Sequence, residues 1–204
     1  MPNNHLSENI IQLYRKYARE WVALRGEDLY EKVWLDRMLA VLPDQANVLD
    51  LGCGSGKPLA TYLIEQGCTV TGVEISELML QMARANFPEQ TWLQADMRQL
   101  NLEQKFDAIL AWDSFFHLTQ DDQRHMFAQF ARHAKLGTVL MFTSGPTHGE
   151  AIRELFGEPL YHASLAPEEY RHLLAQYGFE VLNMVVEDPE CTGHTVWLAQ
   201  KVSQ

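Results

Sequence analysis

The sequence predicts a three-layer α/β sandwich, in which helices cover both faces of a seven-stranded, mainly parallel sheet. Short apolar runs alternate with amphipathic helical segments, which is the pattern of parallel strands joined by right-handed crossovers. A glycine-rich turn directly follows the first apolar run. Late in the chain, the apolar runs 179–186 and 194–200 leave no room for a helix between them, so they are expected to pair as an antiparallel hairpin.

Two amphipathic helices are expected ahead of the first strand, over residues 6–24 and 28–42. In both segments apolar side chains recur at steps of three and four, and Ser7 is the expected N-cap of the first. The first helix also carries an aromatic stripe, which either lines a pocket or only fills the core: Tyr14, Tyr17 and Trp21.

Five further apolar runs are expected to complete the sheet: 47–51, 69–74, 91–95, 106–112 and 138–143. The helices between and after them are expected over these segments: 59–66, 77–86, 120–136 and 167–177. Ser76 and Thr119 are the expected N-caps of two of these helices, and Asp122 occupies the capping-box position. Residues 144–166 form a long connection rich in Gly, Pro and His, which predicts a lid on the substrate side.

Length and composition limit the functional classes. The 204 residues are expected to form one domain, with residues 1–45 as a helical cap and residues 46–204 as the core. A net charge of −11 argues against a nucleic-acid partner, which requires clustered basic side chains. The three cysteines lack metal-ligand spacing, so neither a metal site nor a disulfide framework is expected. The sequence shows neither a signal peptide nor a membrane-spanning run, so the cytoplasm is the expected location, without a membrane partner.

The turn after the first strand is suited to close contact with a ligand. Asp50 lies in that strand, and Gly52, Gly54 and Gly56 follow at every second position, with Cys53 between the first two. Glycine allows a sharp turn and a close backbone approach. The turn lies at the carboxyl edge of the sheet, where ligands of open α/β folds bind. Its spacing differs from the dinucleotide fingerprint, and no P-loop sequence is present.

Polar residues also follow the second, third and fourth strands, at the same edge of the sheet as the glycine turn. Glu74 ends the second strand about twenty residues after the turn, where an acid either binds the hydroxyls of a ribose or simply faces water. The run Gln94-Ala95-Asp96-Met97-Arg98 follows the third strand, and Trp112-Asp113-Ser114-Phe115-Phe116-His117-Leu118 follows the fourth.

Together these four strand ends resemble the motifs of the class I S-adenosylmethionine-dependent methyltransferases, over residues 48–201. The resemblance implies a Rossmann-like fold, S-adenosyl-L-methionine as cofactor, and an acid at Asp96 that takes the adenine amino group while the next backbone N–H faces the ring. The cofactor-binding residues that it implies are Asp50, Gly52, Cys53, Gly54, Gly56, Glu74, Ile75, Asp96, Met97, Trp112, Asp113, Ser114 and His117.

His117 is the candidate catalytic residue, because an imidazole can act as a general base near neutral pH. The alternative, which the sequence favours, is that it only binds a backbone carbonyl or packs against the cofactor. Polar and aromatic side chains expected near the acceptor side are Tyr14, Tyr17, Trp21, His148, Tyr161, His162, Glu190 and His194. A solvated polar rim is the alternative interpretation of this set.

The favoured function is direct, in-line methyl transfer to the oxygen, nitrogen or sulfur of a small molecule. A protein methyltransferase and a non-catalytic cofactor-binding module remain alternatives. A nicotinamide oxidoreductase ranks last, because its binding domain has another glycine spacing and lacks the antiparallel hairpin. The sequence predicts neither the acceptor nor the oligomeric state.

Overall fold

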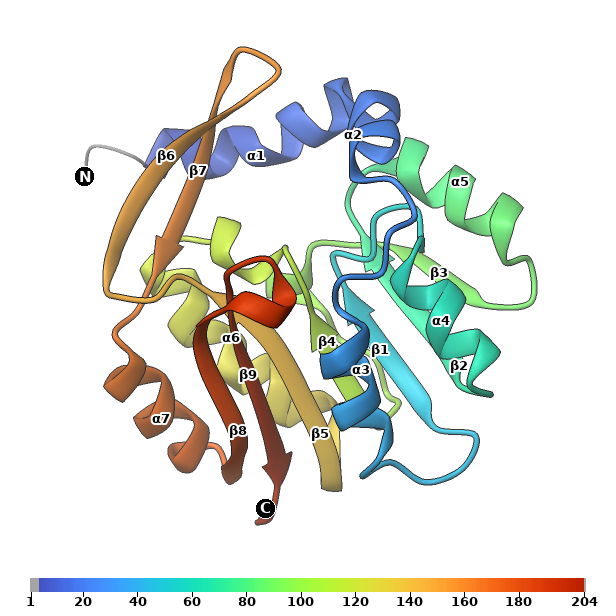
Figure 1. The fold of residues 1–204 in the computed structure, drawn as a ribbon, viewed down its shortest axis with the longest axis vertical. Coiled ribbons are helices and arrows are strands. Elements are labelled where there is room, and N and C mark those ends of the chain that lie inside the picture. Colours follow the sequence, from blue (N-terminus) through green and yellow to red (C-terminus); the bar gives the residue numbers. More distant parts are fainter. Residues whose placement is uncertain (1–3, 204) are drawn as a thin grey trace.

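A seven-stranded sheet forms the centre of the computed structural model, which describes residues 4–203 (Figure 1). Its strands are β1 (Asn47–Leu51), β2 (Thr69–Glu74), β3 (Thr91–Gln94), β4 (Phe106–Ala111), β5 (Ala134–Ser144), β8 (Phe179–Asp188) and β9 (His194–Lys201). They lie in the order β3-β2-β1-β4-β5-β9-β8. Only β9 runs antiparallel to its neighbours, β5 and β8, so the predicted terminal hairpin is confirmed.

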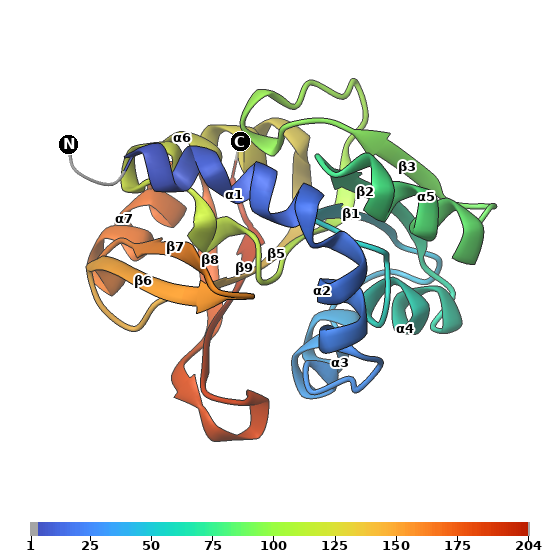
Figure 2. The ribbon, with the colours of Figure 1, turned by 90° about the horizontal axis from the view of Figure 1, so that it is seen from above.

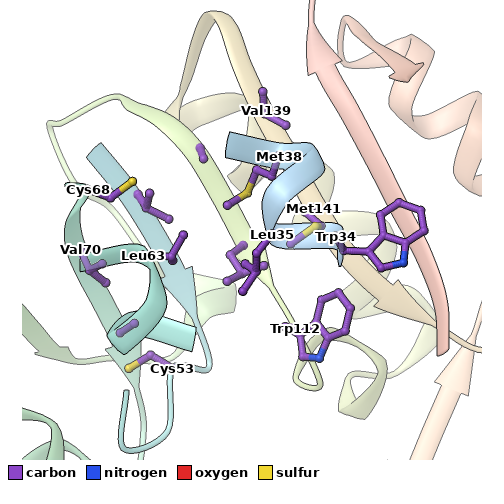
Figure 3. Close-up of a cluster of buried hydrophobic side chains, with 14 of the residues drawn as sticks. Trp34, Leu35, Met38, Cys53, Leu63, Cys68, Val70, Trp112, Val139 and Met141 are labelled. Carbon is purple, nitrogen blue, oxygen red and sulfur yellow. The ribbon is translucent and has the colours of Figure 1, made fainter. Parts of the chain in front are cut away.

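Helices cover both faces of this sheet. They are α3 (Lys32–Leu39), α4 (Leu59–Glu65) and α5 (Glu77–Asn86) on one face, and α6 (Gln120–His133) and α7 (Pro167–Gln176) on the other. Consecutive strand residues point to opposite faces, so Val48 packs in the first cluster and Leu49 in the second. Figure 3 shows the first cluster, where Leu35 and Met38 of α3 lie beside Met141 of β5. The predicted three-layer sandwich is therefore confirmed.

The first predicted helix is interrupted at Tyr17, so three helices rather than two precede β1. They are α1 (Asn4–Lys16), α2 (Ala18–Arg25) and α3. The predicted N-cap at Ser7 is wrong, because α1 begins earlier and Ser7 lies inside it. Ser76 does precede α5, but its hydroxyl makes no capping hydrogen bond. Thr119 caps α6 as predicted, since its hydroxyl oxygen accepts the backbone N–H of Asp122 at 3.1 Å.

The long connection 144–166 folds into a hairpin of β6 (Gly149–Leu155) and β7 (Glu158–Ser164), which forms a separate two-stranded sheet. Most of β6 is exposed and three of its seven residues are charged, so its sequence lacks the apolar alternation that marks a half-buried strand. Figures 1 and 2 show α1 beside this hairpin, at one end of the large sheet. We call α1, α2 and the β6–β7 hairpin the cover.

The cover has a hydrophobic cluster of its own, apart from the two clusters of the sheet: Ile10, Leu13, Leu155, Leu160, Tyr161 and Ala163. Its links to the rest of the protein include hydrogen bonds around η2, a 3₁₀ turn over Phe115–His117, and α6. Ser7 Oγ donates to the carbonyl of His117 at 3.1 Å, and Gln123 Nε2 donates to the carbonyl of Ala163 at 2.9 Å. Over residues 4–203, no helix is long and apolar enough to cross a membrane.

Candidate active site

Two adjoining cavities lie at the carboxyl ends of β1, β2, β3 and β4. The first is lined by eight residues that the sequence predicts to bind a cofactor: Gly52, Glu74, Ile75, Asp96, Met97, Asp113, Ser114 and His117. The second is lined by four others, Asp50, Cys53, Gly56 and Trp112. Trp21, Gly52 and Asp113 line both cavities, so these three residues mark the junction. We call the strand-end residues that line the cavities the floor.

The glycine turn packs tightly against the loop after β4. Gly52 has φ +79°, and a Cβ atom there would lie 2.3 Å from the Cβ of Ser114. The hydroxyl of Ser114 donates to the carbonyl of Leu51 at 2.6 Å, which joins the two loops. Only glycine satisfies both the positive φ and the close approach at this position.

Glu74 is held by backbone groups on both sides. Its Oε1 accepts the N–H groups of Ile75 and Ser76 at 2.8 Å, and its Oε2 accepts the N–H of Gly54 at 3.2 Å. Burial raises the pKa of Glu74, and these three hydrogen bonds oppose that rise. Asp50 lies deeper, and burial followed by the charge of Glu74 raises its pKa to about 7. The floor is therefore acidic and rigidly held at the end of β2.

Asp96 is paired with a cation two residues away in the chain. Both of its carboxylate oxygens accept hydrogen bonds from the guanidinium of Arg98, and Oδ1 also accepts the backbone N–H of Arg98 at 2.9 Å. Burial acts to raise the pKa of Asp96, but these bonds outweigh it and hold the pKa below its ordinary value. Arg98 also reaches Asp122 on α6 at 3.1 Å. Asp96 is thus an oriented, ionised carboxylate on the cavity wall.

His117 is buried where the floor meets the cover. Its Nδ1 lies 2.9 Å from the carbonyl oxygen of Tyr161, which can only accept a hydrogen bond, and its Nε2 lies 2.9 Å from the hydroxyl of Tyr14. Burial lowers the pKa of His117. The neutral ring therefore donates from Nδ1 and accepts the Tyr14 hydroxyl at Nε2. It binds a backbone carbonyl, as the non-catalytic interpretation expects, and it also lines the first cavity, while its role as a general base stays a prediction.

The predicted acceptor-side residues separate into two groups. Tyr14 and Trp21 line the cavities, and their rings meet edge to face with centroids 5.5 Å apart. The other six line neither cavity. Tyr17 bonds Glu158 in the hairpin, Tyr161 bonds Glu150, His148 is exposed beside Gln120, and Glu190 is exposed 3.9 Å from Arg37.

The remaining two are histidines close to the site. The ring of His162 lies 4.6 Å from that of Phe116 and 4.9 Å from that of His117, between centroids. Its buried Nε2 has no hydrogen-bond partner, and burial followed by the charge of His117 lowers its pKa to about 3. His194 binds the carboxylate of Asp113 at 2.9 Å, on the rim of the junction.

Several cavity residues escaped the sequence interpretation. Ile10 and Ile11 of α1, Met79 of α5 and Leu118 after η2 supply apolar wall. They follow ordinary helical or loop patterns, so nothing in the sequence singles them out. Arg98 could have been identified from the sequence, because a cation two residues after Asp96 is close enough to pair with that acid. Within the described part of the chain, no group of three or more His, Cys, Asp or Glu side chains is arranged to hold a metal ion.

The sequence comparisons agree with this geometry. A family model described as "Methyltransferase domain" matches residues 48–137, which span the glycine turn and all four strand ends. An uncharacterized methyltransferase of Geobacillus is 34% identical over 159 residues, covering 76% of this chain and 72% of that protein. The chain belongs to the S-adenosylmethionine-dependent methyltransferases. This family assignment confirms the resemblance found in the sequence.

Other members of the methyltransferase family differ in length and substrate. A dTDP-3-amino-3,4,6-trideoxy-alpha-D-glucopyranose N,N-dimethyltransferase of Streptomyces venezuelae is 37% identical over 101 residues, or 48% of this chain and 42% of that enzyme. The chain spans about half the length of the first curated relatives it matches. Among solved structures, Burkholderia thailandensis 1,6-didemethyltoxoflavin-N1-methyltransferase, with 1,6-didemethyltoxoflavin and S-adenosylhomocysteine bound, superposes with a TM-score of 0.77 at 19% identity, covering 100% of this chain and 91% of that one. At this identity the likeness concerns the fold.

Proposed function

We propose that this methyltransferase family member transfers the methyl group of S-adenosylmethionine to a small-molecule acceptor. The observation that carries the proposal is the placement of Glu74. Its carboxylate is fixed by three backbone N–H groups on the wall of the first cavity, directly beside the glycine turn. Oε2 accepts only one of these bonds, so it retains a lone pair for a ligand hydroxyl.

The residues of the two cavities fit the proposed cofactor. Gly52 leaves room where a side chain would collide with Ser114. Glu74 would take the ribose hydroxyls and Asp96 the adenine amino group. Apolar side chains of the first cavity would contact the faces of the adenine ring: Ile75, Met79, Met97 and Leu118. The second cavity, with Asp50 and Trp112, would hold the amino-acid portion.

S-adenosylmethionine supplies a methyl group that its sulfonium has already activated. The protein then has to align the acceptor with that methyl group and exclude water. Tyr14 and Trp21 reach over the floor from α1 and α2, so we assign them to this task. For a hydroxyl acceptor, Tyr14 Oη would take the acceptor proton while its own proton moves to Nε2 of His117. Burial lowers the pKa of His117, so the ring is neutral and able to receive that proton.

Two observations support a small acceptor. Four residues of α1 line the first cavity, Ser7, Ile10, Ile11 and Tyr14, so the cover forms one of its walls and we expect the acceptor to be small enough to fit beneath it. The Streptomyces relative is named for an amino-sugar nucleotide, and the Burkholderia structure, which is similar in fold, holds 1,6-didemethyltoxoflavin, so both of these proteins bind or modify small molecules. A protein substrate and a purely cofactor-binding role are the alternatives that an acceptor screen separates.

Titration calorimetry with S-adenosylmethionine, S-adenosylhomocysteine and NAD tests the proposal. We expect micromolar binding of both adenosyl sulfur compounds and none of NAD. Glu74→Ala should abolish that binding. Glu77→Ala is the matched control, because Glu77 is an exposed acid on α5 that pairs with Arg84. Binding of NAD alone would contradict the proposed function, as would unchanged affinity in Glu74→Ala.

A further inference from the structure

Asp113 has an unusual backbone conformation at the junction of the two cavities. Its φ of +47° lies in the left-handed region, which few residues other than glycine adopt, although Asp tolerates it better than most. Its backbone N–H donates to the hydroxyl of buried Thr143 on β5 at 3.0 Å. Strained residues persist where their surroundings hold them, and they cluster at functional sites.

Two donors from distant parts of the chain hold the Asp113 carboxylate. His194, at the start of β9, approaches Oδ1 with its Nε2 at 2.9 Å. Tyr30, in the segment before α3, donates its hydroxyl to Oδ2 at 3.2 Å. The Asp113 side chain still keeps 21% of its surface exposed and lines both cavities. The carboxylate is therefore fixed by protein groups while it remains accessible to a ligand.

The surroundings of His194 favour its doubly protonated form. Its Nδ1 lies 2.9 Å from the carbonyl oxygen of Cys191, and its Nε2 faces a carboxylate, so both ring nitrogens meet groups that can only accept. The Thr192 hydroxyl, also 2.9 Å from Nδ1, can accept as well. The ring stacks on both Tyr30 and Trp112, with centroids 5.5 and 5.6 Å away, and aromatic faces favour a cation at such distances.

The polar and charged groups around this imidazole raise its pKa. Burial acts to lower the pKa of His194, but the hydrogen bond and charge of Asp113 outweigh it, and the Cys191 carbonyl and the charge of Glu31 add to the rise. The net result is a raised pKa. The Trp112 ring, labelled in Figure 3, anchors this arrangement to the first sheet cluster.

We propose that His194 is a positioning residue, which holds the Asp113 carboxylate at the junction so that it recognises a cationic centre of the methyl donor. This inference rests on the proposed function. S-adenosylmethionine has two such centres, the sulfonium and the α-ammonium group. S-adenosylhomocysteine keeps only the ammonium. A fixed carboxylate at the sulfonium would favour the methyl donor over the spent product, and one at the ammonium would favour both equally.

Calorimetry on Asp113→Asn with three ligands distinguishes these centres. The ligands are S-adenosylmethionine, S-adenosylhomocysteine and the analogue of the latter that lacks the α-amino group. If the sulfonium is recognised, the ratio of the first two affinities falls about tenfold in the variant. If the ammonium is recognised, the ratio of the last two falls by a similar factor. If neither ratio changes, the inference is overturned, whereas failure of the wild type to bind the adenosyl compounds would overturn the proposed function itself.

Variants of the two donors test the positioning role. His194→Gln keeps an N–H donor toward Asp113 and should retain most of the wild-type ratio, whereas His194→Ala should change the same ratio as Asp113→Asn does. Tyr30→Phe removes only the second donor and should produce a smaller change, and it keeps the test decisive if Asp113→Asn does not fold. His172→Ala, at an exposed histidine on α7, is the control and should change nothing.

Proton NMR titration of His194 supplies an independent readout. In the wild type, its ring should titrate above the ordinary pH range of histidine, and in Asp113→Asn the midpoint should fall. A ratio of affinities does not depend on the fraction of protein that is folded. If His194→Ala lowers only the thermal stability and leaves that ratio unchanged, the residue is structural and the positioning role is overturned.

Discussion

The floor and the cover of the site are built in different ways. The floor lies at the ends of strands that are buried between two large hydrophobic clusters, and backbone N–H groups fix its acid, Glu74. The cover has a small cluster of its own around Leu13 and Tyr161, and side-chain hydrogen bonds join it to His117 of the floor and to Gln123 of α6. The floor is therefore fixed by the sheet core, whereas the cover packs around a core of its own. We expect the cover to open locally while the sheet core stays folded.

This difference assigns separate tasks to the two regions. A ligand that binds between them can be gripped by the floor and enclosed by the cover. Local opening takes place where few apolar contacts hold a segment, and ligand-binding elements belong to this class. We therefore expect the entry and release of ligands to depend on the hydrogen bonds of His117, and recognition to depend on the floor.

The largest expected effect is on stability, and it comes from comparing a core residue of the sheet with a core residue of the cover. Leu49→Ala removes a fully buried side chain from β1 and should cost about 2–5 kcal/mol of unfolding free energy. Leu13→Ala makes the same change in the cover. It should lower hydrogen-exchange protection in α1 and β7 while β1 and β4 remain as in the wild type. Equal loss of protection in all four elements would show that floor and cover unfold as one unit.

The second prediction separates collision from backbone strain in the glycine turn. Gly52→Ala introduces a Cβ atom 2.3 Å from Ser114 at a φ of +79°. It should weaken binding of S-adenosylhomocysteine about 100-fold, since strain of about 1–3 kcal/mol adds to the collision. Gly54→Ala is the matched control: its φ is +55°, but its nearest neighbour is 3.9 Å away. Calorimetry should show a clearly smaller loss there, and equal losses would assign the whole effect to strain.

The third prediction concerns pH. Burial lowers the folded-state pKa of both His117 and His162, the latter to about 3. Their contribution is fully present above the unfolded pKa of about 6.5, and it is lost as the pH falls from there toward the folded value, by at most about 1.4 kcal/mol per pH unit for each group. Hydrogen exchange in α1 and β7, corrected for its intrinsic rate, should therefore accelerate between pH 7 and pH 5. In His162→Asn the acceleration should be smaller, and an unchanged response would exclude His162 as a cause.

The smallest expected effect lies in single hydroxyl groups. Tyr14→Phe removes the partner of His117 Nε2 and should weaken the closed cover by about 1 kcal/mol, because a buried acceptor is left unpaired. Tyr17→Phe removes a hydroxyl that bonds Glu158 in the hairpin and should cost less, since that bond is partly solvated. Exchange rates of α1 amides in the two variants measure the difference. A larger effect of Tyr17→Phe would place the main joint of the cover at the hairpin tip.

Two acids, one after β3 and one after β4, show which contacts the sequence can predict. Asp96 is paired with Arg98, a residue close enough in the chain for the pairing to be suspected from the sequence. Asp113 is paired with His194, which lies 81 residues away on an antiparallel strand. The sequence predicted that both acids and His194 lie at the same edge of the sheet. It did not predict which of them pair, because pairing over that distance depends on the fold.

The sequence by itself determined the strands of the large sheet and the helices between them, the terminal hairpin and the strand-end positions of the floor. It could do so because buried strands, glycine turns and helix breaks are properties of short segments. Only the tertiary structure decided that α1 packs against the hairpin, that the long connection is a pair of strands, and that His117 joins Tyr14 to Tyr161. These features depend on contacts between segments that are far apart in the sequence and are exposed or have no clear apolar pattern. Such segments come together only after the sheet has formed, so the sequence alone does not show which of them will meet.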